Sequence, residues 1–332
     1  MLDVVPSSAP APSAIARGAA LAAGDLAAVE ALLVDLLGSN LAIVSEIGGH
    51  VVRAGGKRLR PLLTVLAARA AGHESQAPIT IAAVGELIHT ATLLHDDVVD
   101  GADFRRGRPA ARHHFGNGLA VLTGDFCLAR GLQAIARLGQ VEAVQSLAET
   151  VAAMAEGEIA QLAGAGAALD RPRYYQIIDG KTASLLGWCA SIGRLVPAAL
   201  AAPLADFGRE FGFAFQIADD VLDYAADPRA TGKPRAQDLR EGKVTLPLIV
   251  ACERDRGLAT RVQDLLRRGP PLADDEAHRI IDAVIESGAI EATLGAADRH
   301  AEAAIAHLSA LPASSARDLL VAVTRETTRR SA

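Results

Sequence analysis

Apolar residues recur at intervals of three and four positions along almost the whole chain, and this pattern predicts a series of amphipathic helices. The first such segment runs from Leu21 to Leu36 and is followed by Gly38, a residue suited to ending a helix. Similar segments predict helices over residues 41–52, 61–71, 79–100, 119–138, 141–162, 172–195 and 204–224, with shorter helices beyond. The breaks between them are short and rich in Gly, Asn and Pro, so none of them predicts a linker between domains.

Composition supports an all-α protein. Half of the 332 residues are apolar, Ala and Leu predominate, and aromatic residues are few. Residues 1–18 differ, because they are rich in Ala, Pro and Ser and lack the basic start and compact apolar block of a secretory signal. We therefore expect a disordered tail over residues 1–18 and a single all-helical domain over residues 19–332.

The charge pattern and the cysteines argue against several functional classes. The net charge is −6 with both signs interspersed, and no basic run suited to a nucleic-acid backbone is present. Cys127, Cys189 and Cys252 are too few and too far apart for a disulfide framework or a zinc site, which favours a reducing, cytoplasmic location. No apolar stretch reaches the roughly 20 residues needed to span a bilayer without a charge, Pro or Gly. Any membrane contact is therefore expected through a lipid substrate or product.

One acidic pattern occurs twice, each time inside a strongly apolar helical segment. Residues four apart share a helix face, so each copy presents a pair of carboxylates. Such a pair needs a counter-charge, and ligands that are all oxygen favour Mg²⁺, which also binds diphosphate. A single copy is equally compatible with a solvated acidic face, but two copies favour a metal site. The expected ligands are Asp96, Asp97 and Asp100 from the first copy and Asp219, Asp220 and Asp223 from the second.

Basic residues accompany both acidic copies. The segment from Gly55 to Pro61 combines a flexible turn, three cations and a Pro suited to the first turn of a helix, which is typical of a diphosphate site. Singly, each cation is compatible with an ordinary surface charge. Together they predict two anionic substrates in one cavity; those further along the chain are Arg105, Arg106, Lys181, Lys233 and Lys243.

In this order, the motifs resemble the signature of the trans-polyprenyl diphosphate synthases. The resemblance extends from about residue 19 to the C-terminus and is specific as a set. It is strongest to the long-chain members that make octaprenyl, solanesyl or decaprenyl diphosphate for quinone side chains. The motifs are residues 55–61, 94–100 and 105–107, Gly124-Asp125, Glu156-Gly157-Glu158, Lys181-Thr182, and residues 215–223 and 241–247.

The resemblance implies one large antiparallel helical bundle around a deep central cavity, of the isoprenoid synthase type, usually in a homodimer. It implies that Asp96, Asp100 and Asp219 hold Mg²⁺ ions, three per active site, against an allylic diphosphate. The same diphosphate would be contacted by Arg105, Lys181, Thr182, Gln216 and Lys233, with Asp220 and Lys243 nearby. Isopentenyl diphosphate would be bound by Lys57, Arg60, His89 and Arg106.

Two positions carry alternatives. His89 is also compatible with a core histidine, but its place two helical turns before Asp96 favours the substrate role. After Lys233 the family pattern would have two adjacent acids, whereas this chain has Gln237 before Asp238. We therefore expect coordination near the second acidic copy to differ from the family.

Small residues beneath the first acidic copy predict a long product. Ala91 and Thr92 lie where short-chain relatives carry bulky aromatics, and Gly85 lies about 16 Å deeper along the same helix face. Ala134 and Ile135, on a facing helix, are candidates for the floor of the cavity. The alternative is that these small residues only permit close helix packing.

Three other functions remain open at this point. A terpene cyclase shares acidic helices and Mg²⁺, but it has no need for the cations of residues 55–61, which suit a second diphosphate. A short- or medium-chain synthase would use the same motifs with a shallower cavity. A non-catalytic subunit of a heteromeric synthase is disfavoured because both acidic copies are intact.

Overall fold

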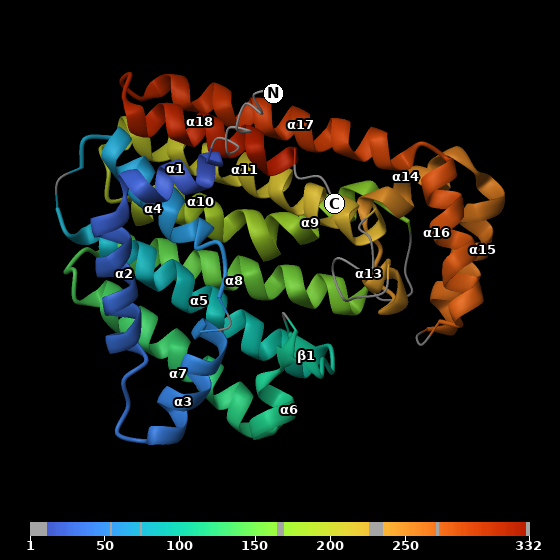
Figure 1. Cartoon of the computed structure of the whole chain (residues 1–332), viewed down its shortest axis with the longest axis horizontal. Coiled ribbons are helices and arrows are strands. Elements are labelled where there is room, and N and C mark those ends of the chain that lie inside the picture. Colours follow the sequence, from blue (N-terminus) through green and yellow to red (C-terminus); the bar gives the residue numbers. More distant parts are fainter. Residues whose placement is uncertain are drawn as a thin grey trace, which may run out of the picture.

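The computed structural model describes residues 12–53, 55–73, 75–105, 107–164, 169–225, 235–269 and 272–329. Within these ranges the protein is almost entirely helical, as predicted (Figure 1). The N-terminal half contains α1 (Ala14–Leu21), α2 (Ala23–Leu36), α3 (Ala42–Arg53), α4 (Leu59–Ala70), α5 (Ala77–Val99), α6 (Ala111–Phe115), α7 (Asn117–Ala136) and α8 (Val141–Ala163). A short antiparallel hairpin, β1 (Phe104–Arg105) with β2 (Arg108–Pro109), separates α5 from α6.

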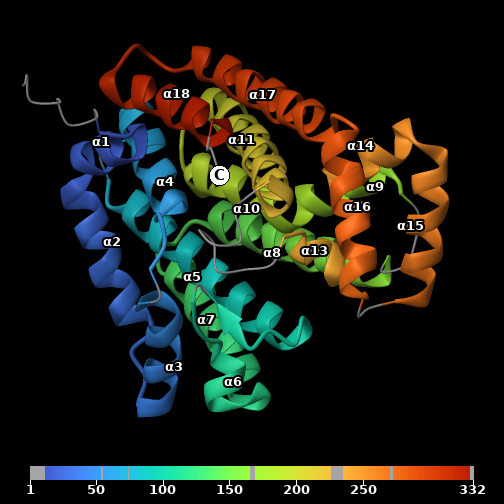
Figure 2. The same cartoon turned by 45° about the vertical axis from the view of Figure 1, so that its right-hand side comes forward.

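The C-terminal half continues with α9 (Arg171–Ile178), a π-helical turn (Asp179–Ala183), α10 (Ser184–Ala190) and a 3₁₀ turn (Ile192–Arg194). It ends with α11 (Ala198–Ala225), α13 (Gln237–Arg240), α14 (Leu246–Arg254), α15 (Arg256–Arg268), α16 (Asp274–Glu286), α17 (Ala289–His307), a 3₁₀ turn (Leu308–Ala310) and α18 (Ser315–Thr328). In both views α15 and α16 lie at the opposite end of the molecule from α2 and α3 (Figure 2).

Helix α5 is the central element of the bundle. It packs against α2, α4, α7 and α10, and residues on all its sides are buried, among them Ile81, Val84 and Leu87. Apolar residues dominate its surface, which explains its place in the core, and its few polar residues, such as His89 and Asp96, line a cavity. Helix α11 packs mainly against α10 and α17. The first acidic copy lies at the end of α5 and the second near the end of α11.

Two predicted boundaries are wrong. The ordered chain begins before residue 19, because Ser13 caps α1 and Ala14 and Gly18 are buried, the latter against Leu62 and Leu66. Residues 1–11, the rest of the predicted tail, lie outside the described residues. The single helix predicted over 172–195 is divided into α9, the π-helical turn, α10 and a 3₁₀ turn.

Two helices differ from the expectation that no segment could span a membrane. By length and composition alone, α5 and α7 are each apolar enough to do so. In α5, 67% of the most apolar stretch is buried inside the protein, the environment of a core helix, whereas in α7 only 39% is buried. One face of α7 therefore exposes apolar residues to solvent.

The three cysteines are free and buried.

Candidate active site

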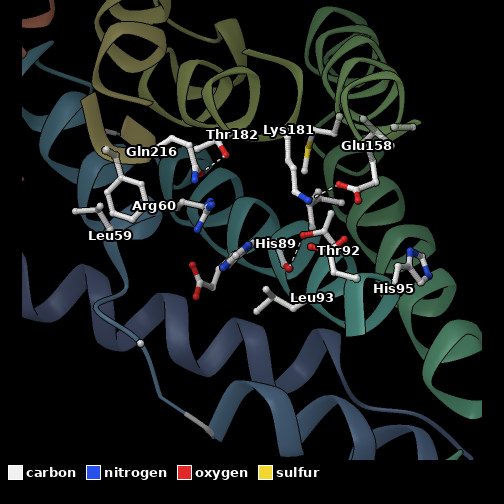
Figure 3. Close-up of a pocket in the computed structure, with 18 of the residues that line it drawn as sticks. Leu59, Arg60, His89, Thr92, Leu93, His95, Glu158, Lys181, Thr182 and Gln216 are labelled. Carbon is white, nitrogen blue, oxygen red and sulfur yellow. Dashed lines mark hydrogen bonds and ion pairs between the residues drawn. The ribbon is translucent and has the colours of Figure 1, made fainter. Parts of the chain in front are cut away.

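One cavity has a volume of about 830 Å³ and is lined by residues of the loop before α4 and of α4, α5, α7, α8, the π-helical turn and α11. Side chains from these elements point into it, as Figure 3 shows for Arg60, His89, Lys181 and Gln216. Its polar lining contains eight residues predicted from the sequence: Lys57, Arg60, His89, Asp96, Lys181, Thr182, Gln216 and Asp219. The remainder of its lining is largely apolar and includes Ile88, Leu128, Val151, Met154 and Phe215.

A second cavity of about 540 Å³ adjoins the first, because Glu158, Lys181, Thr182, Gln216 and Asp219 line both. This second cavity adds a mainly charged lining: Asp100, Asp220, Asp238, Arg240, Glu241 and Lys243. The structure thus brings carboxylates of both acidic copies to one continuous space that is charged on one side and apolar on the other.

In the first acidic copy, Asp96 and Asp100 reach this space and Asp97 does not. Burial raises the pKa of Asp96 to about 6 although the Lys181 ammonium opposes the shift, and Asp100 pairs with Lys243 at 2.9 Å. The Asp97 side chain is 1% exposed and accepts a 2.7 Å hydrogen bond from Arg105 Nε, outside both cavities. Neither Asp97 nor Arg105 lines the two cavities, and the predictions that Asp97 binds metal and that Arg105 contacts the allylic diphosphate stay predictions. Adjacent helix positions point about 100° apart, which explains why Asp96 and Asp97 differ.

In the second acidic copy, only Asp219 opens onto both cavities. Asp220 is buried and accepts hydrogen bonds from Tyr174 and Gln216, and burial raises its pKa well above the ordinary value. Asp223 accepts hydrogen bonds from the backbone N–H groups of Gln237 and Asp238, at 3.1 and 3.2 Å. It lines neither cavity. Asp223 thus connects α11 to the start of α13, and its metal role stays a prediction.

Both acidic copies lie in the last turns of their helices. Helix C-termini carry partial negative charge, which adds to the repulsion among the carboxylates and increases the need for cations there. Among the described residues, no three His, Cys, Asp or Glu side chains lie close enough to hold a metal ion by themselves. The carboxylates therefore form partial sites, which need further oxygen ligands to complete a coordination sphere.

Asp238, the acid that this chain retains beside Gln237, is a site residue that was not among the predicted ligands. It lines the second cavity, and burial together with Asp223 raises its pKa to about 7. The neighbouring Gln237 donates a 2.8 Å hydrogen bond to Glu241, which also pairs with Lys243. The Gln237 side chain therefore holds Glu241, while its backbone N–H donates to Asp223 of α11. Lys233 and Arg106 lie outside the described residues.

Arg58 explains how the loop before α4 holds its shape. It adopts a left-handed backbone conformation and pairs with Glu30 and with the buried Glu86. This pairing holds the backbone at the start of α4 in place. Lys57 before it and Arg60 after it both line the cavity. Glu86 was also missed from the sequence, although a lone acid in an apolar helix is a signal that a buried partner exists.

The π-helical turn presents Lys181 and Thr182 together. A π-turn inserts an extra residue in a helix and is frequent at functional sites. Lys181 Nζ lies 2.5 Å from Glu158, and the Thr182 hydroxyl donates to Gln216 Oε1 at 2.9 Å (Figure 3). The turn packs directly on α8, because a Cβ at Gly157 would lie 2.8 Å from the backbone nitrogen of Lys181.

The residues predicted to control product length are only partly in the cavity. Thr92 lines it, whereas Ala91, Ala134 and Ile135 are buried outside its lining. Gly85 packs on α10, because a Cβ there would lie 2.5 Å from Cys189 Sγ. For Gly85, therefore, the close-packing alternative holds, and the apolar lining of the cavity includes Ile88, Val151 and Met154 instead.

Comparison with known proteins identifies the family. A model of the polyprenyl synthetase family matches residues 42–284. Octaprenyl diphosphate synthase of Escherichia coli is 39% identical over 309 residues, which cover 91% of this chain and 94% of that protein. The all-trans-nonaprenyl-diphosphate synthase of Rhodobacter capsulatus, specific for geranyl diphosphate, is 39% identical over 313 residues, with the same coverage of 91% and 94%.

The fold gives the same result. The structure of a polyprenyl synthase from Caulobacter crescentus, complexed with calcium and isoprenyl diphosphate, matches with a TM-score of 0.90 and 38% identity. The match covers 96% of this chain and 98% of that one. The chain belongs to the polyprenyl synthetase family, and it is a prenyltransferase.

Proposed function

We propose that the protein condenses isopentenyl diphosphate with an allylic diphosphate and releases a long-chain all-trans polyprenyl diphosphate. One observation carries this proposal: Asp96 and Asp219 face one cavity together with Lys57, Arg60 and His89, above an apolar wall. The two sets of polar groups suit two diphosphates, and the apolar wall suits a growing hydrocarbon chain. The names of the octaprenyl and nonaprenyl synthases similar to this chain support a long product.

The residues fit a divalent cation, because the ligands available at the junction of the cavities are carboxylate oxygens from two helices. Asp96, Asp100 and Asp219 would hold Mg²⁺, up to three ions together with the diphosphate. When bound, Mg²⁺ neutralises charge on the leaving diphosphate and thereby favours its departure. The Caulobacter crescentus polyprenyl synthase, which is complexed with calcium and isoprenyl diphosphate, supports the use of a divalent cation.

The chain's own residues then have distinct roles. Lys181, Thr182 and Gln216 hold the allylic diphosphate while its C–O bond to the allylic carbon breaks. Lys57, Arg60 and His89 orient isopentenyl diphosphate so that its double bond attacks that carbon and forms the new C–C bond. The proton then lost passes to the released diphosphate. Ile88, Val151 and Met154 exclude water, which would otherwise trap the allylic cation.

We also propose that two copies of the chain associate through α7 and α8. Exposed apolar side chains that line neither cavity concentrate on α7 and at the adjoining start of α8: Leu119, Leu122, Leu132 and Val141. A set of this kind on adjacent helices is typical of a protein interface.

Incubation of the purified chain with labelled isopentenyl diphosphate, Mg²⁺ and farnesyl diphosphate tests the function. We expect a polyprenyl diphosphate lengthened in five-carbon steps, identified by mass spectrometry, and no hydrocarbon from farnesyl diphosphate alone. A hydrocarbon from that single substrate would indicate a terpene cyclase. No incorporation with any allylic primer would favour a subunit that is inactive alone.

Replacing Thr92 with Phe is expected to shorten the product, because the ring would occupy the cavity immediately below Asp96. The neighbouring Ala91→Phe is the matched control, since Ala91 is fully buried outside the cavity lining. Ala91→Phe should lower the free energy of unfolding, by about 1–3 kcal/mol, without a specific change in product length. The measurement is reverse-phase chromatography of the products. Equal product lengths for wild type and Thr92→Phe would contradict this position for the growing chain.

The metal-free protein should lose stability as the pH rises from about 4 to about 6. Asp96 has a pKa of about 6 in the folded state against an ordinary 3.8, mainly because of burial. The folded state therefore binds more protons than the unfolded state in this interval, and deprotonation favours unfolding. We expect urea denaturation of metal-free Asp96→Asn to show a smaller decline over this interval. Identical pH profiles for variant and wild type would exclude Asp96 as the cause.

A further inference from the structure

Tyr174 lies behind the second acidic copy and has no role in the function described above. It belongs to α9, it is 4% exposed, and its hydroxyl donates a 2.6 Å hydrogen bond to Asp220 Oδ2. Asp220 is 3% exposed, so a carboxylate in this position needs donors from the protein. The Tyr174 hydroxyl supplies one of them.

Two more hydrogen bonds extend this contact to the cavity. Gln216 Nε2 donates to Asp220 Oδ1 at 2.8 Å, and Gln216 Oε1 accepts from the Thr182 hydroxyl at 2.9 Å. Asp220 Oδ2 accepts from Tyr174 and Oδ1 accepts from Gln216, so the Gln216 amide has its nitrogen toward Asp220 and its oxygen toward Thr182. The second N–H of that amide remains for a ligand. Figure 3 shows the last link, between Gln216 and Thr182, at the cavity wall.

We propose that Tyr174 is a positioning residue for the allylic diphosphate. It holds Asp220, which fixes the amide orientation of Gln216 and, through Gln216, the hydroxyl of Thr182. This inference rests on the proposed function, in which Gln216 and Thr182 contact that diphosphate. Gln216 and Thr182 line both cavities, whereas Lys57, Arg60 and His89 line the first cavity only. We therefore expect Tyr174 to affect mainly the allylic substrate.

The variant Tyr174→Phe removes the hydroxyl and keeps the ring, which packs edge-on against Tyr175 at 5.5 Å. Asp220 then loses one donor and can shift, and the amide of Gln216 loses its fixed orientation. We expect the KM for the allylic diphosphate to rise about tenfold, the effect of losing one hydrogen bond to a charged group. The KM for isopentenyl diphosphate should stay within twofold of wild type.

Tyr175→Phe is the matched control, because Tyr175 is adjacent on α9 and its hydroxyl contacts His300 instead of Asp220. Tyr175→Phe should leave both KM values unchanged. A second test combines Tyr174→Phe with Gln216→Ala: if Tyr174 acts through Gln216, the double variant should have the KM of Gln216→Ala alone. Thermal unfolding of each variant shows whether it is folded. If Tyr174→Phe does not fold, the KM values of Gln216→Ala and Asp220→Asn test the hydrogen-bonded chain instead. These two should then share the selective rise in allylic KM.

Two results would overturn the inference while wild type is active. One is equal KM values in wild type and Tyr174→Phe, or rises of the same size for both substrates. The other is additive effects of Tyr174→Phe and Gln216→Ala. Inactivity of the wild type with diphosphate substrates would instead reject the proposed function itself, so the two failures are distinguishable.

Discussion

Asn in place of Asp96 or Asp219 is expected to lower kcat/KM by about 10³-fold, corresponding to several kcal/mol of lost transition-state stabilisation. Each substitution removes a negative charge from the junction where the two helices face the cavities. The remaining carboxylates would bind Mg²⁺ more weakly with diphosphate, so the apparent Mg²⁺ affinity should fall as well. Steady-state kinetics over a range of Mg²⁺ concentrations and calorimetry with inorganic diphosphate measure both effects.

Asp97→Asn is the matched control for metal binding. Asp97 is adjacent to Asp96 in sequence, but its side chain is 1% exposed and pairs with Arg105. The substitution should lower stability through that buried pair while leaving the Mg²⁺ affinity in the presence of diphosphate unchanged. If Asp97→Asn weakened Mg²⁺ binding as strongly as Asp96→Asn, the assignment of the two carboxylates would be wrong.

Gly157→Ala is expected to reduce activity by about 10²-fold, because small displacements of binding groups are costly in catalysis. The added Cβ would lie 2.8 Å from the backbone nitrogen of Lys181 and 3.1 Å from Gly180, and neither backbone atom can move independently. The π-helical turn must then shift away from α8, and Lys181 and Thr182 shift with it. Kinetics should show a raised KM for the allylic diphosphate, and denaturation should show about 1–3 kcal/mol of lost stability.

Gly24→Ala provides the comparison for this variant. Gly24 lies within α2, and a Cβ there would meet nothing within 4 Å. The change should keep full activity and raise stability by roughly 0.5–1 kcal/mol, because Ala favours a helix more than Gly does. Wild-type kinetics in Gly157→Ala would show that the contact between α8 and the π-helical turn does not position Lys181.

Much of this architecture could be predicted because it depends on local sequence. The period of apolar residues identified most of the long helices, and the structure confirms α5, α7 and α8 to within two residues at each end. The four-residue spacing correctly placed Asp96 and Asp100 toward one space, which Asp219 of α11 also lines. Helical periodicity contains this information directly.

The remainder depends on contacts between distant segments. The π-helical turn arises where Gly180 meets Gly157 of α8, and no local pattern in residues 172–195 indicates that contact. The burial of Asp220 depends on Tyr174 from a different helix. Gly85 lies on the predicted helix face, yet Cys189 of α10 occupies the space above it. In each case the partner is remote in sequence, so spacing alone could not identify it.

The most direct test is a crystal structure of the protein with Mn²⁺ and an unreactive thio-analogue of an allylic diphosphate. We expect anomalous peaks from Mn²⁺ near Asp96, Asp100 and Asp219 and next to the diphosphate. We also expect a hydrocarbon tail that passes Thr92 toward Ile88, Val151 and Met154. A diphosphate bound without shared ions, or a tail that leaves the apolar wall empty, would contradict the account.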